Sequence, residues 1–126
     1  MKRLSWLRYP LQIIFLTALV LCLVPQVARA DHGRASATEF NLNTSYSGYI
    51  DSSDTVDFWK VFVSQIGSLK ITVITPSTGD FDVELQNDSG VVLDSSTGGV
   101  GATEIVETDM TYSGLYYVKV YRYINN

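Results

Sequence analysis

The chain has few of the residues that most often carry enzyme chemistry. Its 126 residues include one cysteine, Cys22, and one histidine, His32. Because Cys22 lies in the apolar N-terminal stretch described below, the rest of the chain can form no disulfide. A serine or cysteine nucleophile needs a rigidly placed general base. His32 lies in a polar segment near the start of the mature chain, where we expect it to be exposed to solvent.

Other catalytic signals are missing or have a plainer explanation. No spacing typical of zinc ligands or of a glycine-rich nucleotide loop occurs. The tripeptide Asp88-Ser89-Gly90 matches the motif of aspartic proteases. It directly follows Asn87 and stands between two strand-like runs, which predicts a hairpin turn. The sequence therefore predicts a protein that is not an enzyme.

The first thirty residues have the three-part pattern of a secretory signal peptide. A positively charged start precedes an apolar run at residues 11–24, and Ala28-Arg29-Ala30 matches an A-x-A cleavage site. The apolar run is shorter than the ~20 residues that span a membrane, and Pro25 ends it. We therefore expect a signal peptide at residues 1–30 and a secreted protein, either extracellular or periplasmic.

Basic residues are scarce after this leader. Four of the nine lie within it: Lys2, Arg3, Arg8 and Arg29. All thirteen acidic residues follow it, so residues 31–126 carry five positive and thirteen negative side chains and a net charge of −8. Such a surface disfavours nucleic acid, which needs basic patches, and is compatible with cation binding or with solubility. We expect no membrane contact once the leader is removed.

After a polar N-terminal arm at residues 31–39, short apolar and β-branched runs alternate with turn clusters. No run shows a sustained helical period. Several short strands at regular spacing are typical of a β-sandwich or barrel, so residues 40–126 are expected to form one all-β domain. The expected strands are Phe40–Leu42, Ser47–Ile50, Val56–Val63, Leu69–Ile74, Phe81–Gln86, Val91–Asp94, Thr103–Glu107 and Leu115–Tyr121.

Alternation within these strands indicates which side chains lie in the core, because successive side chains of a strand point to opposite faces. Trp59 and the valines at 61 and 63 share one face and are predicted to be core. The last strand is apolar on both faces, so alternation alone does not decide which face is core. The same alternation separates six more apolar residues from polar neighbours: Leu69, Ile71, Val73, Phe81, Val83 and Leu85.

Four motifs follow one another in a specific order. They are a glycine-containing strand at 48–50, an acidic entry into a long strand at 54–63, an Asp-Phe-Asp-Val-Glu-Leu strand at 80–85 before the glycine turn, and a Ser-Gly-Leu-Tyr-Tyr-Val-Lys-Val strand at 113–120. In this order and spacing they resemble the bacterial pre-peptidase C-terminal (PPC) domain, which is often found behind secreted proteases. The resemblance runs from about Phe40 to Tyr123. Collagen-binding modules of secreted collagenases look like relatives.

The resemblance implies a jelly-roll-like antiparallel β-sandwich. It also implies a non-catalytic accessory module that binds an extracellular polymer, either a protein fibre or a polysaccharide, or a partner such as a secreted peptidase. The family usually ends with one further strand of the type Y-x-L-x-V, and here the chain stops at Asn126 inside the preceding loop. Two alternatives follow. The chain is the N-terminal fragment of a longer exported protein with no function of its own, or a partner strand fills the open position.

Three acids form a candidate calcium site. Asp51, Asp54 and Asp57 are spaced by three across a loop that enters a strand, and Ca²⁺ takes about six to eight oxygen ligands. The resemblance implies that Asp54 and Asp57 correspond to calcium-ligating positions of the collagen-binding relatives. The acidic N-terminal segment of those relatives is reduced here to Asp31 and Glu39. Two interpretations stay open: a calcium site, or acids that shape a turn and keep an edge soluble.

Tyrosines crowd the C-terminal segment, at positions 112, 116, 117, 121 and 123. A tyrosine ring suits a binding surface because it is large and amphipathic and has few rotors to order. In the resemblance, Tyr121 and Tyr123 match positions near the last strands where aromatic residues contact collagen. We therefore predict that these two side chains contact a ligand.

Overall fold

The strand-forming runs of the sequence fold into two stacked sheets. The structure, a computed structural model, describes the backbone of residues 9–14 and all of residues 33–123. Within these ranges it contains one short 3-10 helix, η1 (Arg34–Ser36), and nine strands. The strands are β1 (Tyr9–Ile14), β2 (Thr38–Glu39), β3 (Tyr46–Ile50), β4 (Val56–Val63), β5 (Gly67–Ile74), β6 (Phe81–Asn87), β7 (Val92–Ser96), β8 (Thr103–Met110) and β9 (Gly114–Arg122).

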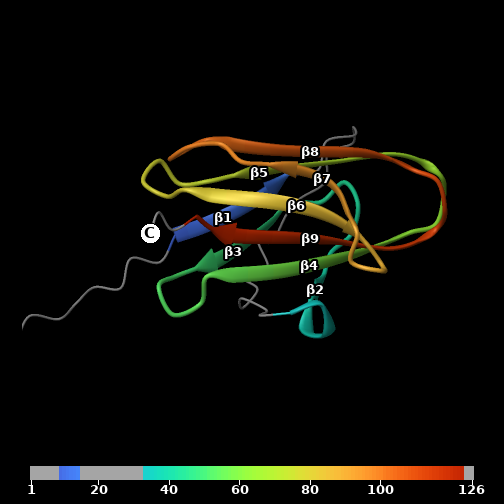
Figure 1. Ribbon diagram of the computed structural model, residues 1–126, viewed down its shortest axis with the longest axis horizontal. Helices are drawn as coiled ribbons and strands as arrows, with labels where there is room; N and C mark the ends of the chain where they lie inside the picture. The colour runs from blue at the N-terminus through green and yellow to red at the C-terminus, as the bar shows by residue number, and fades with distance from the viewer. Residues whose placement is uncertain (1–8, 15–32, 124–126) are drawn as a thin grey trace, which may run out of the picture.

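One sheet has the strand order β3-β1-β5-β8, and the other has the order β2-β4-β9-β6-β7 (Figure 1). All pairings are antiparallel except the short one between β2 and β4. Among the described strands, β6 and β7 are the only consecutive pair within one sheet, so every other connection crosses from one layer to the other. The predicted all-β sandwich is confirmed, with jelly-roll-like crossings.

The core lies between the two sheets, where the predicted alternation places it. Trp59, Val61 and Val63 of β4 are buried, and so are the six further apolar residues that alternate along β5 and β6. On β9, Tyr116 lies in the core with its alternate neighbours Val118 and Val120. The other face of β9, which includes Tyr121, therefore points away from the core.

The first expected strand differs from the observed one. The sequence predicted Phe40–Leu42, whereas β2 ends at Glu39. The Phe40 side chain is buried, and its backbone N–H donates to Lys60 O at 2.9 Å. The chain then leaves the sheet and turns at Asn43, whose φ of 59° lies in the left-handed region that asparagine tolerates better than most residues. The segment predicted as a polar arm thus contains η1 and β2.

Strand β1 comes from the segment predicted to be a leader. It lies between β3 and β5 and pairs with both. The remaining residues of the predicted leader, together with Asp31 and His32, lie outside the described residues. The other expected strands occur where predicted: β4 has the predicted bounds, and β8 extends to Met110.

Candidate functional site

The side chains of β6 and β9 that point away from the core form a polar and aromatic surface that is only partly exposed. Asp82, Gln86 and Tyr117 are buried in it, and its other members are half-buried. The backbone positions of these side chains are paired across the two antiparallel strands. We call the six residues the β6–β9 surface: Tyr117 opposite Gln86, Lys119 opposite Glu84, and Tyr121 opposite Asp82.

Lys119 links the acidic and aromatic parts of this surface. Its ammonium nitrogen lies 3.3 Å from Glu84 Oε1 and 4.4 Å from the centroid of the Tyr121 ring. A cation over an aromatic face is held by the negative potential of the ring. Gln86 Nε2 donates a hydrogen bond of 2.8 Å to the second oxygen of Glu84. These contacts restrict the orientation of the half-buried Tyr121 ring.

Tyr121 is also coupled to Asp82 on the neighbouring strand. Burial raises the pKa of the Tyr121 hydroxyl, and the charges of Asp82 and Glu84 and the hydrogen bond to Asp82 raise it further. Burial likewise raises the pKa of Asp82, with the nearby Asp80 and Glu104 adding to this and the hydrogen bond from Tyr121 opposing it. The Tyr121 hydroxyl therefore remains protonated at neutral pH and donates to the Asp82 carboxylate.

Tyr123 follows directly after β9 and is 49% exposed. Its backbone N–H donates to Asp80 O at 2.9 Å, and the preceding Arg122 N–H donates to Thr55 O at 2.9 Å. The end of β9 is thus tied to the segments before β4 and β6. The structure brings the two predicted ligand-contacting tyrosines, Tyr121 and Tyr123, to the same end of the sandwich.

The predicted acidic site begins at this same end, in the turn between β3 and β4. Asp51 Oδ1 accepts hydrogen bonds from the Ser53 N–H at 2.8 Å, the Ser53 hydroxyl at 2.7 Å and the Asp54 N–H at 3.0 Å. The Asp51 N–H donates back to Asp54 O at 2.9 Å. This arrangement is a side-chain-capped turn, which aspartate favours.

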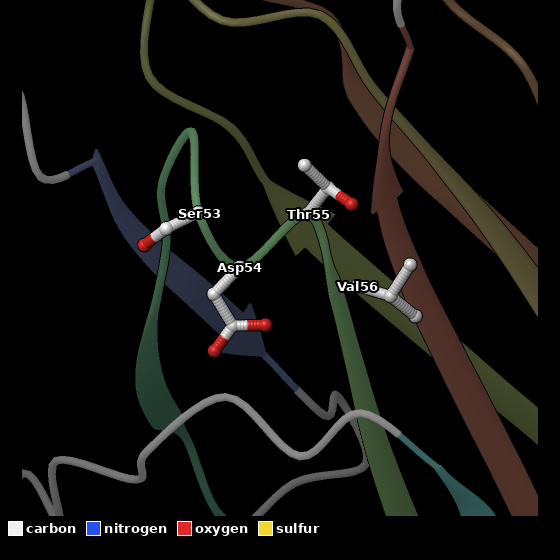
Figure 2. A pocket seen from close by; sticks show the side chains of 4 residues that line it. All are labelled: Ser53, Asp54, Thr55 and Val56. Carbon is white, nitrogen blue, oxygen red and sulfur yellow. The ribbon is translucent and has the colours of Figure 1, made fainter.

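A pocket of about 240 Å³ opens beside this turn. The described residues that line it are Ser53, Asp54, Thr55 and Val56 (Figure 2). In Figure 2 the Asp54 carboxylate and the Thr55 side chain project in opposite directions from the chain, and Val56 lies beside β9. The backbone position of Val56 is opposite Tyr121, so the acidic turn and the tyrosines are neighbours.

Asp57 belongs to a different environment. It is fully buried, and its Oδ2 accepts a hydrogen bond of 2.9 Å from the Trp59 indole N–H. The structure thus places Asp51 and Asp54 in one turn and the Asp57 carboxylate in the core. Residues 33–123 contain no group of three or more His, Cys, Asp or Glu side chains placed to hold a metal ion. The hydrogen bonds of Asp51 favour the turn interpretation, and calcium binding stays a prediction.

Sequence reasoning missed two residues that organise the structure. Arg34 lies 4.3 Å above the Tyr117 ring, and its Nη2 donates to Asn87 O at 3.1 Å and to Asp88 O. Glu104 is only 1% exposed and accepts hydrogen bonds from the Ser96 hydroxyl and the Gly98 N–H. No sequence feature distinguishes Arg34 from the other residues of its polar segment. For Glu104, the one sequence feature that indicates a close backbone approach is the adjacent pair of glycines at 98 and 99.

The hairpin turn predicted at Asp88-Ser89-Gly90 is confirmed, since these residues lie between β6 and β7. Asn87 Oδ1 accepts hydrogen bonds from the Ser89 and Val91 N–H groups. Gly90 has a φ of +83°, a conformation that favours glycine. The geometry of the turn therefore explains the tripeptide Asp88-Ser89-Gly90.

Neither the scan of protein-family models nor the search of curated proteins finds a match to this chain. Within the described part of the chain, no helix has the length and apolar character needed to cross a membrane. The fold and the site together define an all-β sandwich with a polar and aromatic surface along β6 and β9. The Tyr121 end of this surface lies next to the acidic turn.

Proposed function

We propose that this protein is a secreted, non-catalytic binding module of the PPC type. It binds an extracellular polymer or a partner protein through Tyr121 and Tyr123. The order of its sequence motifs supports the class, and the leader pattern supports secretion. The observation that carries the proposal is the placement of two tyrosines: Tyr121 points away from the core, and Tyr123, two residues later, is exposed. Tyr116 of the same strand lies in the core instead.

The chemistry of the surface suits a polymer ligand. Tyrosine rings offer flat faces for sugar rings or for apolar side chains of a protein fibre. Tyr123 is 49% exposed, and the Tyr121 hydroxyl, which donates to Asp82, still has lone pairs that can accept a hydrogen bond. Because Lys119 and Asp82 already hold Tyr121, little side-chain freedom is lost on binding. The half-buried Glu84 beside the ring provides an acceptor for hydroxyl or amide donors of the ligand.

The test is a sedimentation assay of the purified protein with two insoluble probes, fibrillar collagen and microcrystalline cellulose. Tyr121→Ala and Tyr123→Ala should each weaken binding about tenfold, which corresponds to ~1.4 kcal/mol, to whichever of the two probes the native protein binds. Tyr123→Ala should leave the melting temperature nearly unchanged because its ring is outside the core. Tyr112→Ala, an exposed tyrosine before the opposite end of β9, is the matched control and should bind normally. Equal binding by the Tyr121→Ala/Tyr123→Ala double variant would exclude this surface.

A further inference from the structure

Strand β3 owes its place in its sheet to β1. In the order β3-β1-β5-β8, the only described strand that pairs with β3 is β1. The pairs run from Tyr9 opposite Ile50 to Ile13 opposite Tyr46, and β1 also pairs with β5 from Gln12 to Ile14. The predicted cleavage after Ala30 would remove β1 and leave β3 and β5 on either side of an empty strand position.

We propose that the position between β3 and β5 is a strand-binding site. Residues 9–14 occupy it before cleavage, and an extended segment of a partner polypeptide occupies it afterwards. This position is in one sheet and the β6–β9 surface is in the other. The strand-binding site therefore goes beyond the proposed function and is tested independently of it.

The two strands that border the position need an occupant. Without β1, the facing edges of β3 and β5 expose N–H and C=O groups that a strand would pair. The same edges border the core, because Tyr46 and Ile50 of β3 and Ile71 and Val73 of β5 are buried. Loss of β1 would therefore open both backbone groups and apolar side chains to water.

The register defines the chemistry of the occupant. It is a strand of about six residues, antiparallel to both neighbours, as β1 is. Positions opposite Tyr46, Gly48 and Ile50 belong to the buried face of β3, so the partner needs apolar residues at these alternate positions. Gly48 has no side chain, which leaves room for a large residue across from it.

One backbone feature of residues 9–14 favours exchange. Within these residues, β1 pairs with β3 through Pro10 and with β5 along Thr72–Ile74. Pro10, opposite Tyr49, has no N–H to donate and is disfavoured inside a sheet. A partner strand without proline at this position has one more backbone N–H to donate than β1 has. This is the strand-addition mode of peptide recognition.

The experiment uses the full chain, produced without export, with residues 28–30 replaced by a specific protease site. Cys22→Ser removes the native thiol, and Ser47→Cys places a thiol opposite position 12. After cleavage, an excess of a labelled peptide of residues 7–16 with Gln12→Cys is added. The peptide cysteine carries a thiopyridyl mixed disulfide, so that attack by the thiolate introduced at position 47 forms the new disulfide and releases thiopyridone. We expect this disulfide to form with the cut chain and much less with the uncut chain.

Two control peptides sharpen the result. A peptide with Leu11→Lys and Ile13→Lys should cross-link at least tenfold less, and one with Pro10→Val should compete several-fold better than the natural sequence. Equal cross-linking of the natural and lysine peptides would overturn the proposal. Strong hydrogen-exchange protection of β3 after the N-terminal segment is removed, without peptide, would also overturn it, because β3 and β5 would then pair directly.

Discussion

Three buried acids of the described chain each have a hydrogen-bond donor of a different kind. Asp57 accepts from the Trp59 indole, Asp82 is hydrogen-bonded to Tyr121, and Glu104 accepts from the backbone of Gly98. Burial of an acid costs free energy unless such donors are present. Of these three, only Asp82 and its tyrosine donor lie on the outward face, so at this position stability and the proposed ligand binding involve the same groups.

The raised pKa of Asp82 predicts a pH-dependent effect of Asp82→Asn. Between the ordinary value of 3.8 and the raised pKa, the native state holds a proton that the unfolded state has released. The stability contributed by protonated Asp82 is therefore complete below 3.8 and is lost as pH rises through the native pKa. Asn keeps an acceptor for Tyr121 without the charge, so the variant should melt higher than the native protein at pH 7 and equally at pH 3. Thermal melts across this range check the prediction.

The control for that experiment is Asp109→Asn, which removes a charge from an exposed position. It should change the melting temperature little at either pH. A melting temperature of Asp82→Asn below that of the native protein at pH 7 would contradict the prediction, because the charged form would then be the stabilising one.

At the scale of elements, the loop between β7 and β8 depends on a close approach that only glycine permits. A Cβ at Gly98 would lie 2.2 Å from Glu104 Oε1 and 2.5 Å from the Ala102 Cβ. Gly98→Ala should therefore lower the free energy of unfolding by about 2 kcal/mol, as overpacking typically does. Urea denaturation measures this. Gly99→Ala is a matched control, since nothing lies within 4 Å of its added carbon; equal losses in both variants would exclude the clash.

Period-2 alternation could predict most of the strands and the core side chains of β4. It could not decide the core face of β9, because Tyr116 and Tyr117 are chemically alike and only packing against the other sheet distinguishes them. It also missed β1, since an apolar leader and a buried strand have the same composition. Asp57 seemed equivalent to Asp51 and Asp54 by spacing, but alternation with Trp59 places it on the core side of β4.

For the molecule as a whole, the acidic turn and the tyrosines occupy one end of the sandwich, so a calcium ion there would affect both. We expect Asp51→Ala to lower the free energy of unfolding by about 1–2 kcal/mol, because the turn loses its side-chain acceptor. The loss should be equal in calcium and in chelator if Asp51 acts only in the turn. Melts in both conditions measure this.

Magnesium at matched ionic strength is the control, since a chain with a net charge of −8 over residues 31–126 is stabilised by general screening as well. A rise in melting temperature that is specific to calcium and absent from Asp51→Ala and Asp54→Ala would instead establish the calcium site.

The crossings between the two layers have a consequence for the speed of folding. Among the described strands, only β6 and β7 can pair as a local hairpin, and every other strand must find a partner that is distant along the chain. Such topologies fold slowly, on the order of milliseconds to seconds. A newly made chain therefore stays unfolded for longer than a helical protein of this size would, which would suit the proposed export, because a secretion channel passes unfolded chains before the sandwich closes.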